Sequence, residues 1–235
     1  MRKLLILVMA IGALAGVGDR VAVVAAERQI ALAAQEKFEL DDPPKVNVRG
    51  FPFLTQALDG RFDQIDLEAR TAQFEGLTLE RFFVSLYVVT VDPKGLAMVK
   101  KVDRVKVDLG RVRVEVSEGP FNDYLSKSHT GIEVRFVENG FEASSTVEVA
   151  GTKIPLEIRG TVTLVGDALS FKATEIRSGG KDAPGAIQEQ ALRRFTFTQR
   201  MPRLPANITL TGLEISQGSL AVLGEVRGLV ITVNQ

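Results

Sequence analysis

The 235-residue sequence contains no cysteine, no tryptophan and a single histidine. The absence of cysteine excludes disulfide bonds and thiolate metal ligands, and leaves the redox compartment unmarked. A single histidine also argues against an imidazole-based metal centre, because such centres draw on several side chains. The sequence therefore predicts no bound metal and no cofactor.

An excess of one charge is also missing, since 29 lysines and arginines balance 29 aspartates and glutamates. Nucleic-acid-binding proteins usually carry a basic excess that is concentrated on one face. The balance therefore predicts that nucleic acid is not a partner. Protein partners leave no readable signal in the composition.

Long hydrophobic runs are confined to the N-terminus, where Arg2 and Lys3 precede an apolar run from Leu4 to Val17. This run is shorter than the roughly 20 residues that a membrane-spanning helix needs. It is typical of a secretory signal, with Ala13-Leu14-Ala15 resembling a cleavage site, or of a retained signal-anchor. Retention is the preferred alternative, and both predict an extracytoplasmic protein that is membrane-anchored or periplasmic.

Residues 19–38 have helical composition, because alanine, valine and glutamate are frequent while glycine and proline are absent. The prolines of Asp41-Asp42-Pro43-Pro44 end that helix. We therefore divide the chain into a signal or anchor segment (1–18), an amphipathic helix (19–38) and a single β-rich domain (39–235).

Apolar and polar residues alternate through most of the remaining chain, as in Val105, Val107 and Leu109 with their charged neighbours. This period predicts antiparallel strands with one wet face. Hairpin turns are predicted at Asn139-Gly140, Gly151 and Gly166-Asp167. Two short helices are predicted, one after Gly119-Pro120 and one from about Pro184 to Arg194.

These patterns predict an α+β, mostly β fold: a long N-terminal helix, then a strongly curved antiparallel sheet that wraps an apolar groove, with two short helices. Roughly ten one-sided strands present more apolar surface than so few helices can cover. The sheet must then close on its own side chains as a sandwich or barrel, or hold a ligand. Each buried methylene contributes about 0.8 kcal/mol, so acyl chains would suit such a groove.

The least ordinary segment is Gly50-Phe51-Pro52-Phe53-Leu54-Thr55-Gln56, where glycine and proline interrupt an alternating strand and large apolar residues cluster. With Gly60-Arg61-Phe62, it resembles the hallmark of the LmeA-like phospholipid-binding family of bacterial cell-envelope proteins. The resemblance implies a lipid-binding domain related to tubular lipid-binding folds, with phospholipid and the membrane as partners.

The candidate lipid-binding residues are the apolar side chains of this motif and of inward-facing strand positions. They are Phe51, Phe53, Leu54, Phe62, Val107, Phe136, Phe195 and Phe197. For the motif residues two interpretations stay open, because they would either seal one end of the sheet or gate the mouth of a groove.

The candidate head-group residues are arginines that flank Phe195 and Phe197. They are Arg193, Arg194, Arg200 and Arg203. Guanidinium groups form bidentate hydrogen bonds with phosphate. A run of charged residues is also typical of a solvent-exposed face. A second basic surface, diluted by acidic neighbours, comprises Arg104, Lys106, Arg111 and Arg113.

The leading hypothesis is therefore a cell-envelope protein that binds and carries phospholipid and supports glycolipid maturation. One alternative is a structural or scaffolding envelope domain with a self-filled core, and another is an envelope glycolipid enzyme. Nucleophile, phosphate-loop and dinucleotide motifs are absent. His129 lies near Asp123, Ser126 and Ser128, but such sequence neighbours rarely form a catalytic triad. Asp63 and Asp66 suit the wet face of a strand, so we expect no enzyme.

Overall fold

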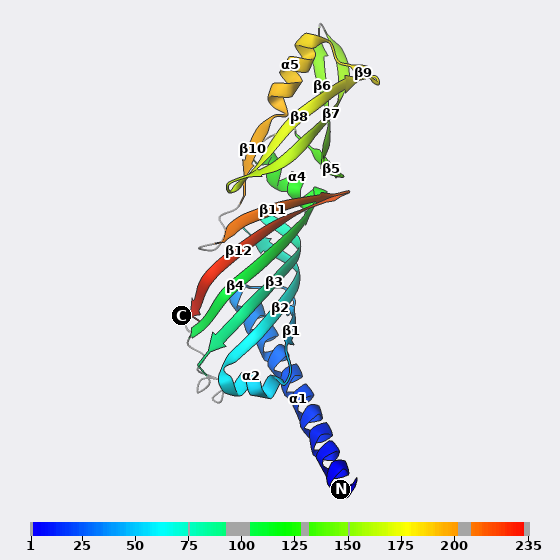
Figure 1. Cartoon of the computed structure of the whole chain (residues 1–235). Coiled ribbons are helices and arrows are strands. Elements are labelled where there is room, and N and C mark those ends of the chain that lie inside the picture. Colours follow the sequence, from blue (N-terminus) through cyan, green and yellow to red (C-terminus); the bar gives the residue numbers. More distant parts are fainter. Residues whose placement is uncertain are drawn as a thin grey trace. The chain divides into compact units, whose positions relative to one another are not determined.

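The computed structural model describes residues 2–74, 76–92, 104–127, 132–149, 151–201 and 208–232. Side chains are described from residue 16 onward, apart from residues 73, 74, 147 and 149. The fold is α+β and mostly β, as predicted, with an N-terminal helix and two antiparallel six-stranded sheets (Figure 1).

Helix α1 (Arg2–Lys37) is one unbroken element that covers both predicted N-terminal segments. Within the described residues, no helix combines the length and the apolar character that crossing a bilayer requires. Helices α4 (Glu118–Ser126) and α5 (Gly185–Arg194) confirm the two predicted short helices.

Helix α2 (Phe53–Asp59) was not predicted, and it contains most of the apolar motif. Pro52 precedes it and Gly60 ends it in the left-handed conformation, at φ 65°. Proline near the start and glycine just past the end are the usual boundaries of a helix. The break in the strand pattern is therefore a helix between two strands.

The first sheet, which we call sheet A, contains β1 (Lys45–Arg49), β2 (Arg61–Phe74), β3 (Leu77–Val91), β4 (Arg104–Ser117), β12 (Ser219–Thr232) and β11 (Thr209–Ser216), in that order. Sheet B contains β10 (Phe197–Arg200), β8 (Ala168–Ser178), β7 (Thr152–Val165), β6 (Gly140–Val149) and β5 (Val134–Val137), with β9 (Lys181–Asp182) paired to β8.

The expected single, strongly curved sheet is thus replaced by two sheets, neither of which is strongly curled. Strands β5 to β8 pair in succession, because tight turns join each to the next. Asn139, Gly151 and Gly166 occupy these turns at positive φ, which confirms the predicted hairpins. Alternation shows that a strand has one apolar face but not which strands share a sheet.

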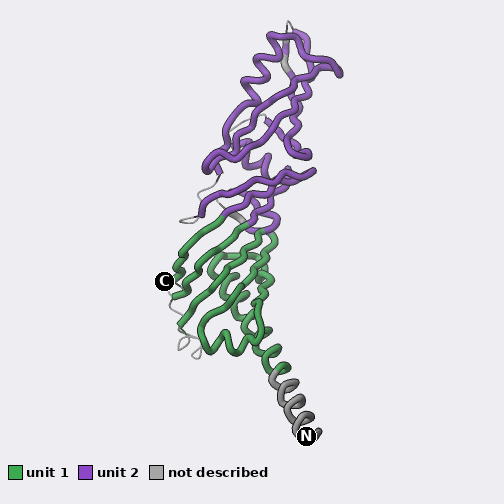
Figure 2. The backbone as a smooth tube through the Cα atoms, in the orientation of Figure 1, with its two compact units in different colours: residues 1–70, 82–112, 225–235 green, residues 71–81, 113–224 purple. Residues whose placement is uncertain are grey.

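The chain divides into two compact units (Figure 2). Unit 1 comprises residues 1–70, 82–112 and 225–235, and unit 2 comprises residues 71–81 and 113–224. The unit boundaries fall inside strands, so β2, β3, β4 and β12 each contribute residues to both.

The core of unit 1 forms where helix α1 packs against sheet A. Val23 and Ala31 of the helix meet strand residues whose apolar side chains share one face. The buried strand and α2 residues of this cluster are Val46, Val48, Phe53, Phe62, Ile65, Val89 and Val107. The apolar residues of the alternating strands therefore form the inner face of sheet A, which packs against α1.

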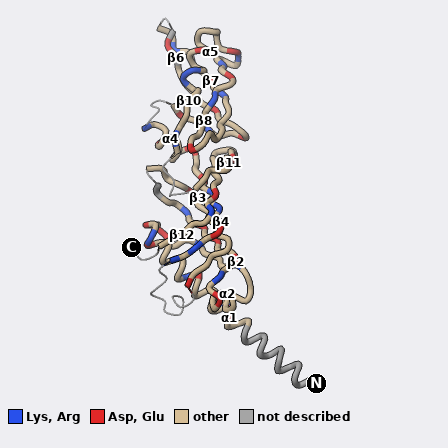
Figure 3. The backbone as a smooth tube through the Cα atoms, turned by 60° about the vertical axis from the view of Figure 1, so that its left-hand side comes forward, with Lys and Arg blue, Asp and Glu red and all other residues tan. Residues whose placement is uncertain are grey.

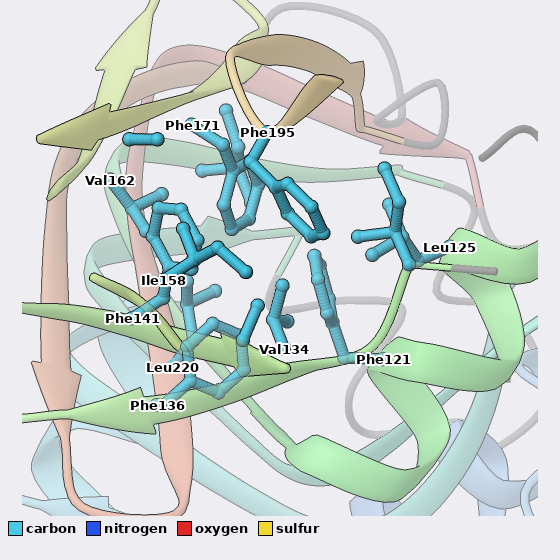
Figure 4. Packing of buried hydrophobic residues seen from close by; sticks show 14 of the residues in the cluster. Phe121, Leu125, Val134, Phe136, Phe141, Ile158, Val162, Phe171, Phe195 and Leu220 are labelled. Carbon is cyan, nitrogen blue, oxygen red and sulfur yellow. The ribbon is translucent and has the colours of Figure 1, made fainter. Parts of the chain in front are cut away.

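The core of unit 2 is aromatic (Figure 4). Phe121 of α4 lies edge-on to Phe136, with ring centroids 5.2 Å apart, and Phe171 stacks on Phe197 at 4.8 Å. Such pairs contribute about 0.5–1.5 kcal/mol beyond their buried area. Phenylalanines from a helix and four strands therefore hold this unit together.

Candidate functional site

The Gly50–Gln56 motif forms a corner that joins β1 to β2. The Gln56 side chain donates from Nε2 to the Arg49 carbonyl at 3.3 Å, and its Oε1 accepts from the Asp63 backbone N–H at 2.9 Å. Gly50 has φ 102°, and a Cβ there would lie 2.5 Å from Gln56 Nε2. The glycine and glutamine of the motif therefore fix the geometry of this corner.

Helix α1 holds the same corner through acidic side chains. Asp19, which is only 2% exposed, accepts from the Leu54 N–H at 2.8 Å, and Glu27 accepts from the Val48 N–H at 2.9 Å. The second Asp19 oxygen, Oδ2, is buried without a hydrogen-bond partner among the described residues. Sequence reasoning missed this role, although two acidic residues eight positions apart in an alanine-rich helix were the available signal.

The structure separates the apolar residues of the motif into two groups. Phe53 is buried and lies 5.9 Å from Phe62, measured between ring centroids. Phe51 and Leu54 are exposed, and the Arg20 guanidinium lies 5.3 Å from the centre of the Phe51 ring. Phe53 therefore belongs to the core, whereas Phe51 and Leu54 face solvent.

The inner face of sheet A also carries apolar residues that are only half-buried. Phe82, Val84 and Leu86 alternate along β3, and Val112 lies on β4, two residues from Gly110. A Cβ on Gly110 would approach both Val226 and Leu86, which places these positions on one face. We call Phe82, Val84, Leu86 and Val112 the β3–β4 strip.

The β3–β4 strip lies outside the well-packed part of the core. Among the described residues, Phe82, Val84 and Val112 belong to neither hydrophobic cluster, while Leu86 packs at the edge of the α1 cluster. Side chains that belong to a hydrophobic core pack against many others on all sides. The strip is therefore apolar surface with incomplete cover, which sequence reasoning did not single out.

Unit 2 contains an open pocket of about 520 Å³ beside strands β7 and β11. Its apolar lining comes from Val162, Leu164, Leu213 and Ile215. Asn139, Thr163 and Glu214 make the rest polar. Its volume suits a small ligand, but its polar lining suits acyl chains less well than the strip does.

The predicted lipid-binding residues do not gather at one place. Val107 packs in the unit 1 core with Phe53 and Phe62. Phe136 and Phe195 are fully buried in the unit 2 core, and Phe197 packs against its edge. Only Phe51 and Leu54 of the set are exposed.

Three of the four predicted head-group arginines lie in the described residues, and Arg203 lies outside them. Arg193 pairs with Glu189 at 2.8 Å on α5, and the Arg194 guanidinium lies 5.9 Å from the Phe195 ring centre. Arg200 is exposed on β10. A phosphate-binding role for this group stays a prediction.

Two arginines of β4 form ion pairs with glutamates of β12 and β11. Arg111 binds Glu225 at 3.1 Å and Arg113 binds Glu214. A hydrogen bond to Glu225 and the negative charge of Glu225 raise the pKa of Arg111. Figure 3 shows basic and acidic residues interspersed along the chain. The second predicted basic surface, which also includes Arg104 and Lys106, is therefore partly neutralised.

The structure describes only some of the candidate catalytic residues. Ser128 and His129 lie outside them. Asp63 is exposed, and Asp66 pairs with Arg49. Within the described chain, no group of three or more potential metal ligands is found.

Apolar surface on the face of a sheet is typical of proteins that bind another protein, a membrane or an apolar ligand. Residues 17–225 match the LmeA-like phospholipid-binding family, and the chain belongs to that family. No curated protein matches the sequence.

Proposed function

We propose that the protein binds a glycerophospholipid in the bacterial cell envelope and buries its acyl chains against the β3–β4 strip. Family membership supports phospholipid as the ligand. The observation that carries the location is that Phe82, Val84 and Val112 are half-buried and belong to neither hydrophobic cluster. Covering each methylene there would contribute about 0.8 kcal/mol.

The binding mechanism that we propose is passive. Apolar burial holds the acyl chains, and no covalent step takes place. The N-terminal apolar run supports an extracytoplasmic location at the membrane. In that setting the protein would carry phospholipid and support the maturation of envelope glycolipids.

Lipid extraction followed by mass spectrometry tests this proposal. Protein purified from a bacterial host should yield phospholipid, and it should take up a fluorescent phospholipid. Val84→Asn and Val112→Asn should lower uptake about tenfold, because each places an amide against the acyl chains. The matched control is Val165→Asn, at an exposed position near the β7–β8 turn, which should bind normally.

Circular dichroism must show that both strip variants stay folded. If the wild type yields no lipid and takes up none, phospholipid binding is refuted. If Leu213→Asn lowers uptake while the strip variants do not, the pocket beside β7 and β11 holds the lipid instead.

A self-filled structural domain is the second candidate, and the tightly packed phenylalanine core of unit 2 favours it. Under that function, Val112→Asn would lower only the stability, because no lipid site exists to be lost. An enzymatic function predicts that His129→Ala or Asp63→Asn abolishes an envelope glycolipid reaction in folded protein. We propose that both variants keep full lipid uptake.

A further inference from the structure

Exposed apolar side chains gather on the two helices that meet at the Gly50–Gln56 corner. We call them the α1–α2 patch, and its members are Val17, Val21, Val24, Phe51, Leu54 and Leu58. Leu58 is 79% exposed, Val21 is 66% exposed and Phe51 is 65% exposed. Single exposed apolar residues are ordinary, whereas a group of them marks an interaction site.

Spacing places these residues on common faces of their helices. Val17, Val21 and Val24 are separated by four and three positions on α1, and Leu54 and Leu58 by four on α2. Phe53, on the other side of α2, is buried against Phe62. Helix α2 therefore has an inward apolar face and a second apolar face in solvent.

Polar contacts join the two halves of the patch. Asp19 of α1 accepts the Leu54 N–H at 2.8 Å, and Arg20 lies against the Phe51 ring. Both contacts come from α1 residues that lie between Val17 and Val21. Helix α2 and Phe51 are thus held against the same stretch of α1 that carries the exposed valines.

The adjoining sequence indicates what covers the patch. Helix α1 continues from Val17 into the apolar run that begins at Leu4. At 1.5 Å per residue this run is about 21 Å long, less than the roughly 30 Å of a bilayer's hydrocarbon core. An apolar run of this length is typical of an interfacial segment or a signal sequence rather than a span, and the patch begins where it ends.

The side chains beside the patch suit the depth of lipid head groups. Arg20 and Arg28 are exposed on α1, and Arg20 pairs with an aromatic ring. Arginine and aromatic side chains are favoured at membrane interfaces, where an apolar body and a charged tip are both accommodated.

We infer that the α1–α2 patch inserts into the lipid interface, so that the Gly50–Gln56 motif is a membrane-docking corner. This goes beyond the proposed function, because docking uses the outside of α2 while acyl burial uses the inner face of sheet A. The two sites share no residue.

The absence of cysteine allows a direct test on the full chain. Leu58→Cys carries an environment-sensitive fluorophore, and Val165→Cys, also exposed, carries it in the control. On vesicles of phosphatidylcholine and phosphatidylglycerol, the label at position 58 should shift to the blue and be quenched about twofold by nitroxide lipids. The label at position 165 should do neither.

Two outcomes would overturn the inference. One is a label at position 58 that stays accessible to a water-soluble quencher on vesicles. The other is shielding of that label, without vesicles, together with efficient Leu58→Cys cross-linking between chains, which would assign the patch to a second copy.

A triple variant separates docking from lipid binding. Val17→Ser, Val21→Ser and Leu58→Ser together should speed dissociation from vesicles about tenfold, because apolar area no longer enters the interface. The phospholipid recovered by mass spectrometry should be unchanged. Loss of bound lipid with normal docking would refute the inference, and failure of the strip variants to lower uptake would refute only the proposed function.

Discussion

Gly110 occupies a position on the inner face of sheet A where any side chain would collide. A Cβ there would lie 2.7 Å from Cγ1 of Val226 on β12. We expect Gly110→Ala to lower the free energy of unfolding by about 1–3 kcal/mol through overpacking. Denaturant unfolding followed by circular dichroism measures the change.

The matched control is Gly119→Ala, where an added Cβ meets no atom within 4 Å and the residue lies in α4. That variant should be neutral or slightly stabilised. Adding Val226→Ala to Gly110→Ala should restore part of the lost stability. Equal unfolding midpoints for Gly110→Ala and Gly119→Ala would show that a Cβ at position 110 fits beside Val226 without strain.

The hydrogen bonds to the Asp66 carboxylate should make the stability of the protein depend on pH. Partial burial raises its pKa, but hydrogen bonds from Gln64, Arg49 and Ser85 and the charge of Arg49 outweigh it, so its pKa is lowered. A lowered folded-state pKa adds stability above the unfolded value of about 3.9. That contribution is lost as the pH falls through the folded-state pKa.

We expect Asp66→Asn to lower stability at pH 7 by at most about 1 kcal/mol, because Arg49 is largely exposed and the pair is screened. The difference from wild type should shrink as the pH falls below about 4. Urea unfolding at neutral and acidic pH measures it, with the exposed Asp108→Asn as a control for charge loss. If the stability difference between wild type and Asp66→Asn grew in acid, the lowered pKa of Asp66 would be contradicted.

Sequence reasoning at the residue scale identified apolar positions better than polar ones. Val107 and Phe136 are buried because alternation marks the inward side of a strand. Asp19 and Gln56 escaped prediction because each bonds a backbone group that only the folded chain brings near. Their partners lie 35 and 7 residues away.

At the scale of elements, α4 completes the edge of sheet B. The Asn122 side chain donates to the Val134 carbonyl and accepts the Val134 N–H, both at 2.9 Å. Glu118 accepts the Phe136 N–H at 2.7 Å. These side chains bond β5 as a neighbouring strand would, so that the edge is covered.

We expect Asn122→Ala to lower the free energy of unfolding by about 1–3 kcal/mol, because it leaves both Val134 backbone groups without their partner. Amide hydrogen exchange should accelerate at Val134 while β7 stays protected. Asp123→Ala, at an exposed position one residue on, is the matched control. Unchanged exchange at Val134 would contradict the role of Asn122.

The elements differ in how far the sequence specified them. Helices α4 and α5 have proline near their starts and helical spacing, and the hairpins have glycine or asparagine at positive φ. Helix α2 has only seven residues, and Gly50 and Pro52 before it resemble an interrupted strand. Its helical signal was the pairing of Pro52 with Gly60, which is easily outweighed by a cluster of phenylalanines.

At the scale of the molecule, the two hydrophobic cores are linked by continuous strands. The chain passes between units within β2, β3, β4 and β12. Because four strands continue from one core into the other, we expect a single unfolding transition.

Two core truncations test this cooperativity. Val107→Ala in unit 1 should cost about 2 kcal/mol and Phe136→Ala in unit 2 about 3–5 kcal/mol. Both should move one transition, seen identically by circular dichroism and by calorimetry. A second transition that responds to only one of the substitutions would show that the units unfold separately.

The whole-molecule prediction from sequence was partly right for a physical reason. Periodicity required a mostly β chain with unsatisfied apolar faces, and the family match agrees with a lipid ligand. Strand partners depend on long-range pairing that alternation does not encode, so one curved sheet was predicted where two sheets exist.

The strands shared by the two units also constrain how this protein can change over evolutionary time. A recombination event at residue 70, 81, 112 or 224 would cut through a strand, so neither half can be inherited as a cassette. Insertions and deletions should instead accumulate at hairpin tips such as Gly151 and Gly166-Asp167, where an added Cβ on either glycine meets nothing within 4 Å. Related sequences should therefore vary in length at those tips while keeping the four shared strands intact.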